Sequence, residues 1–239
     1  MESKKFTYET YYDQELKFEI GADRFTYRLD QNEPVIAEYK DIRAMKINRL
    51  ANTLDIRIQG CDVLISVPFG MENFLSFTEE LAARLAHANR DKIESACLSF
   101  SASRMFYTIM AVILSAPAIL LAALLLNFQA IESLDTIPAV ITFVIPVGLL
   151  GYGVILPTRA VPEKNRLILK GLLRKTVIDY SRIERAAFEL LDMKKRGKLL
   201  VVALILKSGK TIRIKWLSDL IFFFMALRFH LDKYQKTGS

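Results

Sequence analysis

The side chains that could do chemistry in this sequence are mostly bases, and they gather late in the chain. Seven of them are expected at one hairpin tip and on the strands beside it: Lys194, Lys195, Arg196, Lys198, Lys210, Arg213 and Lys215. Ammonium and guanidinium groups attract anions, so we expect this surface to bind anionic lipid head groups or an acidic protein partner. A solvated basic surface without a specific ligand is the alternative. Nucleic acid is disfavoured because the aromatic residues of this region are concentrated in the last helix, away from the bases.

No set of residues indicates catalysis, and we expect a non-enzymatic protein with no catalytic residues, no metal site and no cofactor. The two histidines, His87 and His230, fall on predicted helices with no further ligand at metal-binding spacing. Cys61 and Cys97 do not have the spacing of a metal motif. The sequence also lacks phosphate-binding loops and nucleophile motifs.

Charge is divided unevenly between the two ends of the chain. Residues 1–103 hold 13 Lys and Arg against 17 Asp and Glu, a net charge of −4. Residues 158–239 hold 19 Lys and Arg against 7 Asp and Glu, a net charge of +12. We therefore expect the two regions to have different partners, and their opposite charges favour docking of one region on the other.

Two apolar runs without a charged residue, 105–131 and 136–158, separate these regions. Each run exceeds the length that a membrane-spanning helix needs, which is about 20 residues. The sequence therefore predicts a transmembrane hairpin within 104–158, with helices at about 105–127 and 137–157. Bases flank the hairpin and acids occupy its loop. By the positive-inside rule, this predicts a multi-pass membrane protein with both termini in the cytoplasm.

Outside the predicted hairpin, short alternating strands are followed by one amphipathic helix, and this order occurs twice. The sequence Tyr39-Lys-Asp-Ile42 aligns with Tyr180-Ser-Arg-Ile183. Amphipathic helices expected near 71–88 and 218–234 end the two copies. The chain therefore predicts an internal repeat of one small antiparallel-sheet domain.

The second copy carries a family resemblance. Its residues 167–183 contain an aliphatic strand, a turn glycine, a second aliphatic strand and a Tyr-x-x-Ile sequence, and a paired hairpin follows at 199–214. This pattern resembles the pleckstrin-homology-like (PH-like) domains of bacterial membrane proteins, in which a bent seven-stranded antiparallel sheet is closed by a C-terminal helix. The resemblance implies an integral membrane α+β fold class and a location in the bacterial cytoplasmic (inner) membrane. Two small cytoplasmic PH-like domains, an acidic one at 1–103 and a basic one at 159–239, would flank the hairpin.

The last predicted helix is apolar on more than one face. A PH-like domain buries one face of this helix, which leaves Ile221, Phe222 and Met225 as surplus apolar residues. We expect these three side chains to meet the bilayer interface, the other domain or another subunit.

These features together predict a membrane-anchored binding or scaffold protein. Its basic C-terminal domain would dock on anionic lipid or on an acidic protein partner, and a phospholipid membrane would be its main partner. The alternative is a structural or regulatory subunit of a larger membrane transport complex or homo-oligomer, in which small residues of the hairpin pack against other helices.

Overall fold

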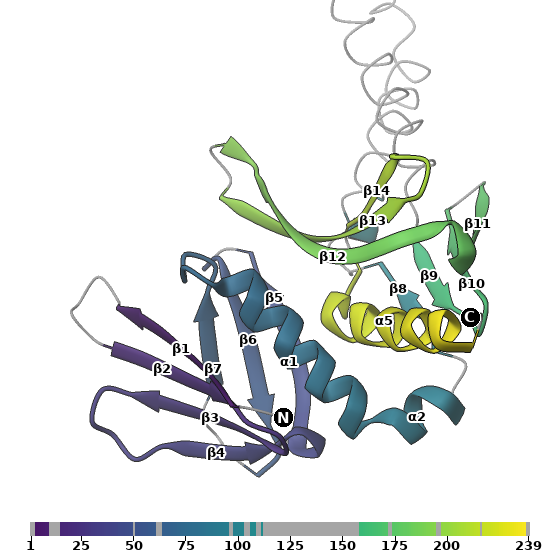
Figure 1. Ribbon diagram of the computed structural model, residues 1–239. Coiled ribbons are helices and arrows are strands. Elements are labelled where there is room, and N and C mark those ends of the chain that lie inside the picture. The colour runs from purple at the N-terminus through teal and green to yellow at the C-terminus, as the bar shows by residue number, and fades with distance from the viewer. Residues whose placement is uncertain are drawn as a thin grey trace, which may run out of the picture.

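In the computed structural model the chain forms two similar β-sheet units that pack against each other (Figure 1). The described residues are 3–9, 15–49, 51–60, 64–95, 98–102, 106–108, 111, 158–171, 174–194, 197–215 and 217–237. The first unit ends with residue 95. The second unit combines residues 98–102 with residues from 158 onward.

The first unit consists of two antiparallel sheets and a covering helix. Its four-stranded sheet follows the order of the chain: β1 (Lys4–Glu9), β2 (Glu15–Ile20), β3 (Arg24–Leu29) and β4 (Val35–Glu38). A 3-10 helix and a three-stranded sheet come next: η1 (Tyr39–Asp41), β5 (Ile42–Asn48), β6 (Thr53–Ile58) and β7 (Leu64–Pro68). The chain of this unit ends in two helices: α1 (Phe74–Ala88) and α2 (Arg90–Ser95). Phe77 of α1 contacts the rings of Phe6, Phe18 and Phe25, so α1 closes the core over the first three strands.

The second unit repeats this order. Its four-stranded sheet contains β8 (Phe100–Ser101), β9 (Arg159–Pro162), β10 (Arg166–Lys170) and β11 (Lys175–Asp179). The remaining elements are η3 (Tyr180–Arg182), β12 (Ile183–Asp192), β13 (Lys198–Leu206), β14 (Thr211–Ile214) and α5 (Leu220–Thr237). Two rings of α5 anchor it to the sheets: Phe223 contacts Phe100, and Phe224 lies 4.1 Å from Phe188 between ring centroids.

The repeat extends to irregular features of the backbone. Tyr39 and Tyr180 each begin a 3-10 helix, and both side chains are buried. The strand that follows each 3-10 helix shifts its pairing register within its first three residues. Such a shift is a bulge that bends the strand, and its recurrence at equivalent positions shows that the two sheets turn in the same way.

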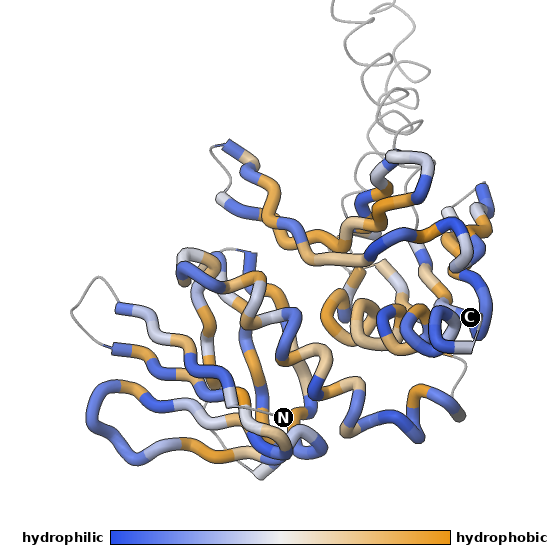
Figure 2. Tube along the Cα trace, viewed as in Figure 1, coloured by the Kyte–Doolittle hydropathy of each residue, from blue (hydrophilic) through white to orange (hydrophobic). Residues whose placement is uncertain are grey.

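The two units pack through their helices, since α1 lies against both α5 and β12 (Figure 1). Glu79 fixes which side of α1 faces the second unit, because its Oε1 accepts a hydrogen bond from the backbone N–H of Phe188 at 3.2 Å. Ala82 and Ala86 lie on the same side and are buried, which lets the helices approach closely. Figure 2 shows that the first half of α5 is hydrophobic. The contact between the units therefore combines buried apolar residues with polar contacts, including the Lys233–Glu94 ion pair at 3.0 Å.

Residues 103–157 are inserted in the first hairpin of the second unit. Strand β8 pairs with β9, and the backbone N–H of Ala102 donates to the carbonyl oxygen of Thr158 at 2.6 Å. The chain therefore leaves and re-enters the second unit at one point. Strand β8 falls within the predicted N-terminal domain, 1–103, yet it completes the sheet of the second unit, as β1 does in the first.

The structure contradicts the predicted fold class of an integral membrane α+β protein. Among the described residues, no helix is long and apolar enough to cross a membrane. The longest of these helices, α5, has 18 residues and carries charged side chains through its second half. The prediction of a multi-pass inner-membrane protein with cytoplasmic termini is wrong on the same finding. The predicted spans, 105–127 and 137–157, lie outside the described residues except for 106–108 and 111.

Candidate functional site

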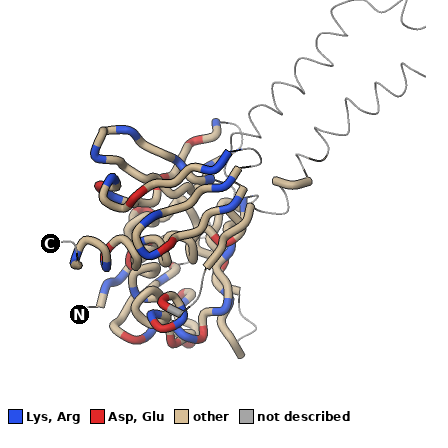
Figure 3. Tube along the Cα trace, turned by 90° about the vertical axis from the view of Figure 1, so that its right-hand side faces the viewer, with Lys and Arg blue, Asp and Glu red and all other residues tan. Residues whose placement is uncertain are grey.

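Three exposed bases form a row across neighbouring strands of the second unit, where bases predominate over acids (Figure 3). Lys170 of β10 lies directly opposite Lys175 of β11 on one side and Arg159 of β9 on the other. Directly opposed residues project from the same face of a sheet, with Cβ atoms about 5 Å apart. We call Arg159, Lys170 and Lys175 the cation row.

The local sequence determines where the row lies. Leu169 points into the core, so its neighbour Lys170 points outward from the same strand. The turn after β10 is closed by a hydrogen bond from the N–H of Gly171 to the carbonyl oxygen of Arg174, at 2.6 Å. This turn brings Lys175 opposite Lys170, and the pairing of β9 with β10 adds the third base.

No member of the cation row forms an ion pair with another residue that the structure describes. Arg159 donates a hydrogen bond from Nε to the hydroxyl of Ser99, which is a neutral partner. Like charges that lie directly opposite each other destabilise a sheet. The row is therefore suited to an anion that lies across it.

The predicted basic hairpin tip joins the two units. Lys194 and Lys198 are exposed at the end of the β12–β13 hairpin, whereas Lys195 and Arg196 lie outside the described residues. The backbone N–H of Lys198 donates to Oδ1 of Asn52 in the first unit at 3.2 Å. The tip therefore contributes to the contact between the units, and only part of it is exposed to a partner.

The other predicted bases differ in whether an ion pair within the protein already neutralises their positive charge. Lys210 is exposed in the turn between β13 and β14. Arg213 makes a bidentate ion pair with Glu189, with Nε–Oε2 and Nη2–Oε1 distances of 2.7 and 3.0 Å. The hydrogen bond from Arg213 outweighs burial and, with the charges of Arg213 and Lys215, lowers the pKa of Glu189. Arg213 is thus neutralised within its own sheet, while Lys210 and the half-buried Lys215 form no ion pair with a described residue.

Two of the three surplus apolar residues of the last helix, Phe222 and Met225, lie where the units meet. Ile221 and Met225 are buried, and Phe222 is half-buried. Phe222 and Met225 line a cleft whose other wall belongs to the first unit. Of the three environments expected for these side chains, the structure therefore places Phe222 and Met225 against the other unit.

This cleft, which we call the junction cleft, has a volume of about 540 Å³. Its floor is apolar and comes from both units: Ile42 and Ile93 from the first, Phe100 and Met225 from the second. Three bases and one acid also line it. An apolar floor with charged groups around it is typical of small-molecule sites between domains.

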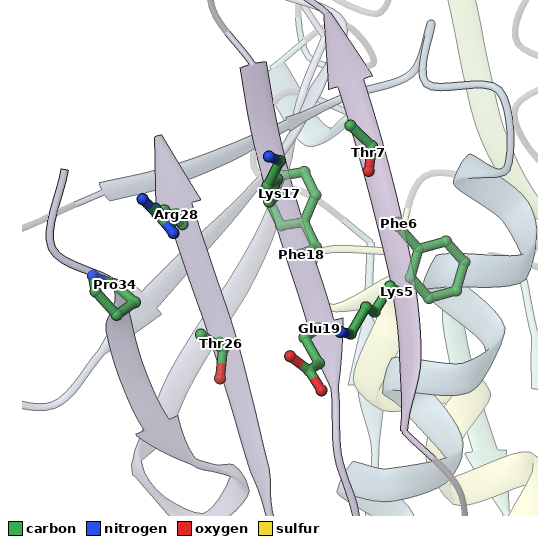
Figure 4. A pocket seen from close by; sticks show the side chains of 9 residues that line it. All are labelled: Lys5, Phe6, Thr7, Lys17, Phe18, Glu19, Thr26, Arg28 and Pro34. Atoms are coloured by element: carbon green, nitrogen blue, oxygen red, sulfur yellow. The ribbon is translucent and has the colours of Figure 1, made fainter. Parts of the chain in front are cut away.

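A second hollow, of about 490 Å³, lies over the outer face of β1, β2 and β3 (Figure 4). Lys17 lies directly opposite Arg28 there, and Lys5 lies directly opposite Glu19. Lys17 is neutralised by an ion pair with Glu15 at 2.7 Å, and Glu19 adds a negative charge to the same face. This hollow is therefore less suited to an anion than the cation row.

A comparison with protein-family models and with curated proteins found no match. Within the described ranges, no group of three or more His, Cys, Asp or Glu side chains could hold a metal ion. His87 is exposed, and His230 is half-buried in α5. Burial and then the charge of Lys233 lower the pKa of His230, and Glu94 opposes this shift. The two histidines lie on different helices, and neither is part of a metal-binding group among the described residues.

Two features of these sites were missing from the sequence-based expectations. The cation row joins bases that lie 5 and 11 positions apart in the chain, at the ends of different strands. The sequence feature that could have indicated the cation row is a base at each of three strand ends. This feature shows that the bases are neighbours only when the register of the strands is known. The junction cleft has no sequence signal beyond the surplus apolar residues Phe222 and Met225.

Proposed function

We propose that the protein is a non-enzymatic binding protein that presents its cation row to an acidic protein partner. The observation that carries this proposal is the direct opposition of Arg159, Lys170 and Lys175, which form no ion pair with described residues. Each unit also has four strands, then three, then a helix, and this order supports the resemblance to PH-like domains.

The open edge of β11 indicates what form the partner takes. Among the described strands β11 pairs only with β10, so the N–H and C=O groups of its other edge can pair with an added strand. Val177 follows Lys175 by two residues, projects from the same face and is 41 % exposed. We therefore expect an extended segment that places an acidic residue near Lys175 and an apolar residue near Val177.

Electrostatics and backbone pairing contribute differently to such a complex. An acidic segment relieves the repulsion among the three bases, and opposite charge raises the rate of encounter. Backbone hydrogen bonds to β11 then fix the register of the segment. Because exposed charges are screened by salt, the affinity of the full chain for this segment should fall as the salt concentration rises.

The experiment measures the fluorescence anisotropy of a labelled peptide in which Glu and Val alternate, mixed with the full chain. Lys170→Glu reverses the charge at the centre of the cation row, and we expect it to weaken peptide binding about tenfold, or about 1.4 kcal/mol. The matched control is Arg57→Glu, which makes the same charge change at an exposed position of β6 in the first unit.

The control should bind the peptide within about twofold of the unmodified chain, because an isolated surface charge far from the site contributes little. Equal losses in the two variants would mean that only the total charge of the chain matters, and would overturn the proposal. Binding to vesicles of anionic phospholipid without binding to the peptide would also overturn it, in favour of a lipid surface.

A further inference from the structure

The junction cleft exists because the two units pack together. The first unit supplies the start of β5 and the end of α1 with α2, and the second supplies strand β8 and the first turns of α5. Its volume of about 540 Å³ falls within the range of small-molecule sites, about 300–1,000 Å³. The inference drawn from it does not depend on the cation row, which lies on other residues.

The floor of the cleft is suited to an apolar chain. Ile42, Ile93, Phe100 and Met225 are packed in the core and at most 9 % exposed, so each presents only a small apolar surface to the cleft. Phe222 is half-buried and forms part of the wall. A ligand with an apolar arm would cover this surface and remove it from water, which is favourable in proportion to the apolar area covered.

The charged groups of the cleft favour a negative ligand. Lys40 is neutralised by an ion pair with Glu38 at 2.7 Å. Arg43 donates from Nε to Oε1 of Gln59 at 3.1 Å and forms no ion pair with an acid among the described residues. Lys92 is exposed and forms no ion pair with a described residue. Arg43 and Lys92, which form no ion pair with a described residue, therefore line a cleft with an apolar floor and several polar groups around it.

One acid opposes them. Asp219 lines the cleft and accepts a hydrogen bond from the hydroxyl of Ser218 at 3.0 Å. It stands immediately before the first turn of α5, where unpaired backbone N–H groups carry a partial positive charge that offsets a carboxylate. The net charge of these groups is positive, because two bases and the helix N-terminus outweigh one carboxylate.

We infer that the junction cleft binds a small amphipathic anion, an aliphatic carboxylate with an unbranched chain. The chain lies on the apolar floor, and the carboxylate is held by Arg43 and Lys92 at the mouth. A guanidinium group matches a carboxylate because it can donate two parallel hydrogen bonds. The arrangement discriminates against a neutral alcohol or an alkylammonium ion of the same length, which lack the negative charge.

The test uses the full chain and three probes of equal chain length: decanoate, decanol and decylammonium. Isothermal titration calorimetry measures their affinities, and we expect decanoate to bind at least about tenfold more tightly than decanol. Labelled methionine methyl groups give the location by nuclear magnetic resonance, with Met225→Leu assigning the floor signal. Decanoate should shift the signal of Met225.

The double variant Arg43→Gln, Lys92→Gln removes both positive charges and leaves shorter polar side chains. We expect it to weaken decanoate about tenfold and to leave decanol unchanged, whereas Arg57→Gln should leave both unchanged. Equal affinity for all three probes would mean a purely apolar surface and would overturn the inference. Decanoate binding that leaves the Met225 signal in place would overturn it as well.

Discussion

Tyr39 and Tyr180 occupy equivalent positions, and their hydroxyl groups have different environments. The hydroxyl of Tyr39 donates a hydrogen bond to the carbonyl oxygen of Gly21 at 2.8 Å. The hydroxyl of Tyr180 is buried and has no hydrogen-bond partner among the described residues. Replacing each tyrosine by phenylalanine removes one oxygen atom and keeps the ring. The pair of variants therefore measures the same chemical change in two known environments.

The structure gives the expected magnitudes. Tyr39→Phe loses one hydrogen bond to a half-buried carbonyl, so we expect a loss of about 1 kcal/mol in the free energy of unfolding. Tyr180→Phe removes a buried hydroxyl without a protein partner and keeps the ring contact with Tyr234, so stability should stay constant or rise by up to about 1 kcal/mol. Burial raises the pKa of Tyr39 to about 12 and also raises that of Tyr180, so neither group is charged at neutral pH.

Urea unfolding of the full chain, followed by far-ultraviolet circular dichroism at neutral pH, measures both variants. We expect Tyr39→Phe to be less stable than Tyr180→Phe by about 1–2 kcal/mol. If Tyr180→Phe lost as much stability as Tyr39→Phe, its hydroxyl would have a stabilising partner, and the reasoning would be refuted.

Three further predictions concern the contact between the units and the pH dependence of stability. Glu79→Ala leaves the edge N–H of Phe188 without its acceptor and should lower the unfolding free energy by about 1 kcal/mol, whereas Glu79→Gln keeps an acceptor and should change it little. Gly197→Ala should cost about 1–2 kcal/mol, since φ is +78° and the new Cβ would lie 2.5 Å from Oδ1 of Asn52; a neutral result in the same urea assay would contradict the observed contact. Burial lowers the pKa of His230, so the unfolded chain takes up this proton at higher pH than the folded chain. Stability should therefore fall as the pH drops below about 6.5, and His230→Gln should make that fall less steep in a pH series of unfolding midpoints.

The sequence was sufficient for the local elements of the fold because each strand and helix carries its own periodicity. The helix expected near 218–234 is α5 (Leu220–Thr237), and the hairpin expected at 199–214 consists of β13 (Lys198–Leu206) and β14 (Thr211–Ile214). Strand β8 could not be predicted in this way. It has two residues, and its partner strand β9 begins 58 positions after its last residue, so its placement depends on pairing that local patterns do not report.

The candidate sites depended still more on tertiary structure. Alternation along β10 indicates that Lys170 points outward, but only the register of three strands shows that Arg159 and Lys175 lie beside it. The surplus apolar residues of α5 predicted a contact surface without saying what covers it. In the structure Phe222 and Met225 line the junction cleft together with residues of the first unit, and the bases of the cleft come from that unit.

The most direct test of the binding proposal is amide hydrogen exchange of the full chain with and without the peptide of alternating Glu and Val. The proposal predicts slower exchange at the open edge of β11 (Lys175–Asp179), because an added strand would accept hydrogen bonds from those N–H groups. Strand β14 (Thr211–Ile214) is the internal control, since it is also a sheet edge but lies away from the cation row in the strand order. Unchanged exchange in β11 with the peptide bound, or equal protection of β14, would contradict the account.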